Sequence, residues 1–127
     1  MAKSTSRLIA VVDDDSSFLK AIERLLSTRP WTTRTFASCQ QFLASLSGGL
    51  PDCLILDLNM PGMSGLELQQ TLIDKGLKIP TIIITSHTDT ETRDRCLSAG
   101  AVAYLPKPVR RTELFAAIDA ASSSVCR

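Results

Sequence analysis

Five short apolar runs alternate along the chain with segments whose apolar residues recur at helical spacing. The runs are residues 8–12, 32–36, 53–56, 81–85 and 102–105. After the first run, one helix face is formed by Phe18, Leu19, Ile22, Leu25 and Leu26. This alternation predicts repeated strand–helix units around a parallel sheet. The strands are almost continuously apolar, which indicates that helices cover both sheet faces.

Residues that begin or end helices lie between these runs. Pro30 closes the first helix, and Ser38 with Gln41 resembles a capping box that opens the second. Apolar residues at 66, 68, 72 and 73 mark a third helix face, with Gly76 as its C-terminal cap. Gly100 follows the fourth helix. The pattern predicts an α/β fold, a flavodoxin-like doubly wound (βα)5 sandwich with a five-stranded parallel sheet of order 2-1-3-4-5.

Length, net charge and cysteine spacing limit the kinds of protein that this chain can be. The 127 residues suit a single domain, and a net charge of +1 creates no overall field for nucleic acid or an anionic membrane. The first apolar run is too short for a signal peptide. The cysteines share no metal-binding or redox spacing: Cys39, Cys53, Cys96 and Cys126. We therefore expect a cytoplasmic protein that does not contact a membrane.

Polar residues follow four of the predicted strands. Asp13 and Asp14 follow the first, Asp57 ends the third, Thr85 ends the fourth and Lys107 lies just past the fifth. Carboxyl ends of parallel strands share one edge, where ligands bind. Clustered carboxylates repel one another, and Mg²⁺ is the cation that such oxygen ligands favour. Asp57 is then a candidate nucleophile for a phosphoryl group, with Thr85 and Lys107 holding the phosphoryl oxygens.

Each of these residues also has an ordinary structural explanation. Acidic residues at a helix start favour the helix dipole, Asp57 and Thr85 suit a strand end, and Lys107 suits a solvated surface. Their joint occurrence at four strand ends favours the site. Asp15 is different, because we interpret it as a first-turn helix residue, with Ser16 or Ser17 helping to cap the helix.

Four segments carry a resemblance to a known family. VVDDD, LDLNMPGMSG, IIITS and AYLPKP, at these separations, resemble the receiver domain of two-component response regulators over nearly the whole chain. The segments TSHTD and MSG are similar to the FixJ-like subgroup, whose members often carry a helix-turn-helix output domain. His87, within TSHTD, is expected in a surface loop near the site.

The resemblance implies a role for each site residue. Asp57 would accept a phosphoryl group from the phosphohistidine of a sensor histidine kinase. The Mg²⁺ ligands that it implies are Asp13, Asp14, Asp57 and the backbone carbonyl of Asn59. Thr85 and Lys107 would contact the phosphoryl group, and Thr85 with Tyr104 would act as the switch. The Lys107–Pro108 bond would be cis, and Val109 departs from the phenylalanine that is frequent there.

The resemblance to receiver domains also implies binding partners and a restricted catalytic activity. The partner would be a sensor histidine kinase, phosphorylation would promote a homodimer, and DNA would be reached only through an output domain outside this chain. We expect residues 1–7 to be an N-terminal tail and residues 122–127 to start a linker. The chain would be no enzyme beyond its own phosphorylation and autodephosphorylation.

Two alternatives remain open. A degenerate receiver would serve as a phosphorylation-independent protein-binding module, although Asp57, Thr85 and Lys107 are all present. A haloacid-dehalogenase-like aspartyl phosphatase would need a second carboxylate two residues after the nucleophile. Here that segment is Asp57-Leu58-Asn59, which lacks the general acid.

Overall fold

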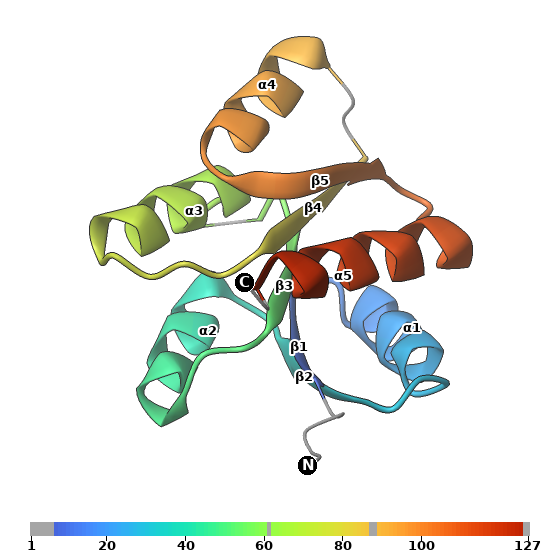
Figure 1. The fold of residues 1–127 in the computed structure, drawn as a ribbon. Helices are drawn as coiled ribbons and strands as arrows, with labels where there is room; N and C mark the ends of the chain where they lie inside the picture. The colour runs from blue at the N-terminus through green and yellow to red at the C-terminus, as the bar shows by residue number, and fades with distance from the viewer. Residues whose placement is uncertain (1–6, 61, 87–88, 126–127) are drawn as a thin grey trace.

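A parallel five-stranded sheet forms the centre of the computed structural model, which describes residues 7–60, 62–86 and 89–125 (Figure 1). Its strands are β1 (Arg7–Val12), β2 (Trp31–Phe36), β3 (Cys53–Asp57), β4 (Thr81–Thr85) and β5 (Ala101–Pro106). They lie in the order β2-β1-β3-β4-β5, and every neighbouring pair is parallel. The predicted fold class and strand order are confirmed.

Helices cover both faces of this sheet. They are α1 (Ser16–Leu26), α2 (Cys39–Ser45), α3 (Gly65–Asp74), α4 (Thr90–Ser98) and α5 (Arg111–Val125), with a short 3₁₀ helix, η1 (Leu46–Gly48), after α2. Figure 1 shows α1 and α5 on one side of the sheet, α2 and α3 on the other, and α4 beside β5. None of the helices in the described part of the chain combines the length and apolar character needed to cross a bilayer.

Two apolar clusters, one on each face, explain the continuous apolar strands. Ala10 and Val12 of β1 pack in one cluster with Phe42 of α2 and Leu68 of α3. Ile9 and Val11, the alternate residues of the same strand, pack in the other cluster with α1 and α5. Since both faces of β1, β3 and β4 are buried, the polar side chains of Asp13, Asp57 and Thr85 lie at the ends of these strands.

The start of α1 differs from our interpretation of Asp15. Asp15 itself is the N-cap, because its Oδ1 accepts hydrogen bonds from the backbone N–H groups of Ser17 at 3.0 Å and Phe18 at 3.3 Å. Ser16 is the first helical residue, so the expected capping by Ser16 or Ser17 is wrong. Asp15 therefore caps a helix while Asp13 and Asp14 remain outside it.

The capping boxes also differ in detail. Ser38 Oγ accepts from the Gln41 N–H at 3.1 Å, but the Gln41 side chain accepts from Ala37 N–H and not from Ser38. The complete capping box is at α3, where Ser64 and Glu67 accept from each other's backbone N–H groups. The predicted box at Ser38 is therefore only half formed.

Two element boundaries and the burial of one residue differ from our expectations. Arg7 begins β1, where we expected the tail to end, and residues 122–125 continue α5, where we expected a linker to start. Ile73 is 50% exposed, although its spacing predicted a buried helix face. His87 and Cys126 lie outside the described residues.

The N-terminus of α3 approaches the end of β3 so closely that it requires glycine. Gly65 N–H donates to Leu58 O at 2.9 Å. A Cβ at Gly65 would lie 2.6 Å from Asp57 O and 3.0 Å from Leu58 Cα. These are backbone atoms, so relief would require moving the loop that carries Asp57.

We expect Gly65→Ala to lower the free energy of unfolding by about 1–3 kcal/mol, because the added methyl group forces the backbone apart. Denaturant unfolding measures this loss. Gly48→Ala is the matched control, since a Cβ there meets nothing within 4 Å, and it should change stability by less than about 0.5 kcal/mol. Equal effects of the two substitutions would contradict the close approach.

Candidate functional site

Three aspartates meet at the carboxyl edge of the sheet. Asp13 and Asp14 follow β1, and Asp57 ends the adjacent strand β3, with Val12 paired to Leu56. Each of the three offers a carboxylate oxygen, and these oxygens all lie within 4.8 Å of one another. Asp13 and Asp57 are 1% and 6% exposed, whereas Asp14 is exposed. The topology therefore concentrates negative charge in a largely buried place.

Lys107 supplies the opposing charge from the loop after β5. Its Nζ lies 2.9 Å from Asp13 Oδ2 and 3.3 Å from Asp57 Oδ1. Its backbone N–H donates to Thr85 O at 2.8 Å, and the Lys107–Pro108 bond is cis, as expected. One ammonium group thus joins the ends of β1 and β3, while its backbone is fixed to the end of β4.

Phe18 also contacts this ammonium group. Lys107 Nζ lies 4.5 Å from the centroid of the Phe18 ring, within the range of a cation–π interaction. The sequence pattern assigned Phe18 only to an apolar helix face. Phe18 lies in the first turn of α1, three residues after Asp15, and no local pattern in the sequence indicates its contact with Lys107.

The electrostatics of the cluster are unequal. Burial raises the pKa of Asp57 from its ordinary 3.8 to about 6, the negative charge of Asp13 adds to the rise, and Lys107 opposes it. Burial lowers the pKa of Lys107, but its hydrogen bond to Asp13 and the charge of Asp57 outweigh this, so the net shift is upward. Lys107 therefore stays charged at neutral pH. The ionised form of Asp57 is less stable in the folded protein than in the unfolded chain.

The remaining predicted residues lie in or just after the strands β3, β4 and β5. Thr85 is fully buried at the end of β4. Tyr104 is half-buried on the neighbouring strand, paired with Ile83, and packs against the apolar cluster beneath α3. Burial, with the nearby Cys96 and Asp89, raises its pKa. Asn59 is exposed and lies two residues beyond Asp57, past the end of β3.

The donor set suits a hard divalent cation. The three side chains that converge offer only carboxylate oxygens, and one of them, Asp14, is open to solvent. Mg²⁺ commonly binds one or two carboxylates and retains several waters, which an exposed ligand allows. The residues present therefore fit Mg²⁺.

The raised pKa of Asp57 generates a test of stability against pH. The folded protein binds a proton at Asp57 near pH 6, but the unfolded chain only near pH 4, so this group lowers stability as pH rises from about 4 to 6. In metal-free buffer at pH 7.5, Asp57→Asn should therefore raise the free energy of unfolding by about 1–3 kcal/mol. The gain should largely disappear at pH 4.5, as thermal or urea unfolding would show.

Asp15→Asn is the control for this test, because asparagine also caps helices and Asp15 lies outside the cluster. It should leave stability nearly unchanged at both pH values. If Asp57→Asn raised the free energy of unfolding equally at pH 4.5 and pH 7.5, the gain would not come from the ionised Asp57 carboxylate. That result would contradict the raised pKa of Asp57.

Comparison with known proteins places the chain in a family. The model of the response regulator receiver domain matches residues 9–119. The response regulator protein TodT of Pseudomonas putida is 39% identical over 114 residues, which cover 90% of this chain and 50% of TodT. The DNA-binding transcriptional regulator NtrC of Escherichia coli is 37% identical over 116 residues, 91% of this chain and 25% of NtrC. The chain thus spans half of TodT and a quarter of NtrC.

Solved structures agree with the sequence relatives. The crystal structure of FixJ-N has a TM-score of 0.86 and 32% identity, over 97% of this chain and 96% of that one. A response regulator receiver protein from Burkholderia phymatum has a TM-score of 0.80 and 40% identity, over 92% and 95% of the two chains. The chain therefore belongs to the response regulator receiver domain family.

Proposed function

We propose that Asp57 accepts a phosphoryl group from the phosphohistidine of a sensor histidine kinase, and that this modification changes a surface read by a partner or output domain. Receiver domains of response regulators are signalling proteins and not conventional enzymes. The observation that carries the proposal is the Asp57 carboxylate at the end of β3, 3.3 Å from Lys107 Nζ and beside two further carboxylates.

The transfer needs a nucleophile and opposing positive charge. A carboxylate oxygen of Asp57 attacks phosphorus, the phosphorus–nitrogen bond breaks, and its electron pair goes to the imidazole nitrogen. The Lys107 ammonium group lies beside the Asp57 carboxylate, where it would donate to one phosphoryl oxygen. The Thr85 hydroxyl would donate to another of these oxygens.

A magnesium ion would be held by Asp13, Asp14, Asp57 and the backbone carbonyl of Asn59. When bound, it supplies positive charge that offsets the phosphoryl oxygens and the carboxylates. Asp13 has a second task, because its Oδ1 accepts from the Asp15 N–H at 2.9 Å while its Oδ2 binds Lys107. This pairing fixes Asp13 in place beside Asp57.

Phosphorylation would reorganise these contacts. It replaces one carboxylate by a group of roughly −1.5 to −2 charges with new acceptor oxygens. Lys107 then turns from Asp13 toward the phosphoryl group, and Thr85 moves to meet it. Tyr104 takes the space that Thr85 leaves, which changes the surface near α4 and β5 and favours a homodimer or an output contact.

The relatives support transcriptional control as the output. NtrC is named a DNA-binding transcriptional regulator, and TodT a response regulator protein. This chain covers only part of either, so DNA would be reached through an output domain outside these residues. A cytoplasmic location and a sensor histidine kinase as partner complete the proposal.

Acetyl phosphate provides the direct test. With Mg²⁺, the protein should gain one phosphoryl group by intact mass spectrometry, and Asp57→Asn should gain none. Asp14→Asn should slow the gain about tenfold or more, because a metal ligand is lost. Asp15→Asn is the matched control from the same run of aspartates and should react like the native protein.

Three results would count against this proposal. An unchanged mass of the native protein would favour the phosphorylation-independent binding module. A phosphoryl group on Asp57→Asn would show a different acceptor, and equal slowing by Asp14→Asn and Asp15→Asn would remove Asp14 from the metal site.

A further inference from the structure

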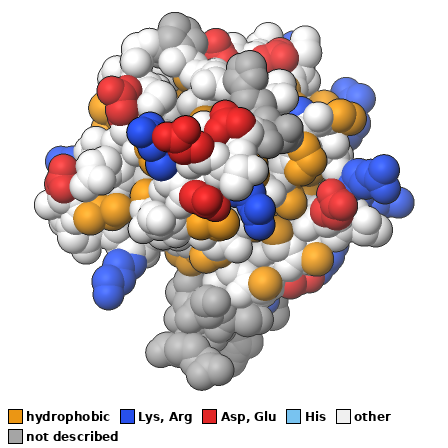
Figure 2. Space-filling model, turned by 90° about the horizontal axis from the view of Figure 1, so that it is seen from above, with side chains coloured by type: hydrophobic (Ala, Val, Ile, Leu, Met, Phe, Trp, Pro, Cys, Tyr) orange, Lys and Arg blue, Asp and Glu red, His pale blue; other side chains and the backbone are white. Residues whose placement is uncertain are grey.

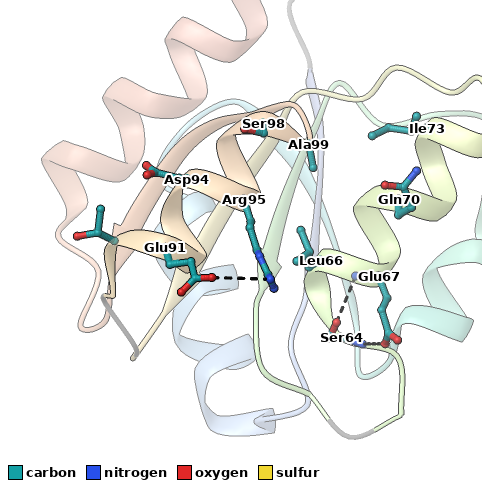
Figure 3. Close-up of a pocket in the computed structure, with 11 residues that line it drawn as sticks. Ser64, Leu66, Glu67, Gln70, Ile73, Glu91, Asp94, Arg95, Ser98 and Ala99 are labelled. Carbon is teal, nitrogen blue, oxygen red and sulfur yellow. Dashed lines mark hydrogen bonds and ion pairs between the residues drawn. The ribbon is translucent and has the colours of Figure 1, made fainter.

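A long groove lies between α3 and α4 and is lined by none of the three aspartates of the acidic site. Its first part, shown in Figure 3, has a volume of about 1320 Å³ and lies between side chains of the two helices. A second hollow of about 470 Å³ continues it toward the start of β5. Both are lined by Ile73 and Ala99, so they adjoin. We call the two together the α3–α4 groove.

The polarity of α4 explains why the groove stays open. Its sequence, TETRDRCLS, contributes a single buried residue, Cys96. A hydrogen bond from Gln69 Nε2 to Cys96 O, 3.2 Å long, joins α3 to α4. The outer parts of the two helices carry few side chains that could pack together, so their facing surfaces remain exposed.

The floor of the groove contains exposed apolar side chains. The described residues include four large hydrophobic side chains that are exposed: Leu50, Ile73, Leu97 and Val102. Two of them, Ile73 at 50% and Val102 at 47%, line the groove, together with Leu66 and Leu77. Apolar area gathered in a concave surface indicates a site for a partner.

Charge is distributed unevenly along the groove. Its wider part is lined by Glu67, Glu91 and Asp94, against a single cation, Arg95. Figure 3 shows Arg95 turned toward Glu91, and the two are 3.8 Å apart with side chains 66% and 83% exposed. A pair this exposed is weak and can be rearranged. Lys78 lies in the narrower part.

The acidic character of the wider part is a local feature. Figure 2, which views the molecule from the side on which α4 lies in Figure 1, shows acidic, basic and hydrophobic side chains intermixed on that face. The protein as a whole has a net charge of +1, so the net charge of −2 in the wider part of the groove is a local feature. Complementary charge would therefore be basic.

We propose that the α3–α4 groove binds an amphipathic helix of a partner protein, with the apolar face of that helix on Ile73 and Val102 and its basic residues beside Glu91 and Asp94. The ten residues of α3 span about 15 Å, which suits a partner helix of about three turns. Helices that dock in this way use apolar anchors at every third or fourth position.

A second copy of this chain does not supply such a helix from its described residues. The apolar residues of α1 and α5 are buried in the chain's own core: Leu19, Ile22, Leu26, Leu114 and Ile118. None of the groove's lining residues belongs to the Asp57 cluster, so the unmodified protein should already bind such a helix. The proposed occupant is therefore an exposed basic amphipathic helix that does not come from the described residues of this chain.

A synthetic peptide tests this inference on the unmodified protein. The probe is a capped 14-residue helix with leucine at every third or fourth position and lysine flanking the leucines in one half. Titration followed by NMR should shift resonances of α3 and α4. The double variant Glu91→Lys/Asp94→Lys should weaken binding by about tenfold, and Ile73→Ser by about fivefold.

Matched controls separate the groove from general attraction. Glu23→Lys/Glu113→Lys makes the same change of charge on α1 and α5, with Glu113 in a first helical turn as Glu91 is, and should weaken binding less than twofold. Leu50→Ser removes a side chain that is 46% exposed outside the groove and should have no effect. A peptide with glutamate in place of lysine should bind only the Glu91→Lys/Asp94→Lys protein.

Several results would overturn the inference. Equal weakening by the two double variants would show diffuse electrostatic attraction. Shifts centred away from α3 and α4 would place the peptide elsewhere. Shifts of the same groove resonances with protein concentration alone would make the occupant a second copy of this chain.

Discussion

The ammonium group of Lys107 is the contact on which the carboxyl edge of the sheet depends. It lies 2.9 Å from Asp13 and 3.3 Å from Asp57, two carboxylates that are almost fully buried on adjacent strands. Without it, burial and the charge of Asp13 would raise the pKa of Asp57 with no opposing positive charge from Lys107. The ammonium group also contacts the Phe18 ring of α1, and the backbone N–H of the same residue donates to Thr85 O of β4. A single residue therefore links four elements.

The strand order makes this contact possible. In the order β2-β1-β3-β4-β5, the ends of β1 and β3 are neighbours and the chain after β5 returns across them. Both sheet faces are filled by apolar clusters, so the edge is where charged groups can meet. The residues that line the α3–α4 groove are different from those of the acidic cluster, and its polar helix α4 is joined to α3 through Gln69. The proposed chemistry and the proposed docking thus use different residues of the same fold.

Hydrophobic pattern predicted the strands, the helices and the burial of both sheet faces, because each of these depends on local periodicity. Strand-end positions predicted that Asp13, Asp14, Asp57 and Lys107 would meet, since parallel topology places them at one edge. The sequence pattern could not decide which of several adjacent residues caps a helix or is buried. Asp15, Ser16 and Ser17 are all good N-caps, and only the backbone decides that Asp15 serves. Leu72 and Ile73 both fit an apolar face, yet only Leu72 is buried. The Phe18 contact with Lys107 joins residues 89 positions apart, which no local pattern encodes.

A double-mutant cycle between Asp57 and Lys107 tests the central role of this ammonium group most directly. The free energy of unfolding would be measured at pH 7.5 without metal for the native protein, Asp57→Asn, Lys107→Gln and the double variant. Because Lys107 offsets the charge of Asp57, Lys107→Gln should cost at least about 1 kcal/mol more in the native background than in Asp57→Asn. Costs that agree within about 0.3 kcal/mol would mean that the two groups do not interact, and would contradict the account.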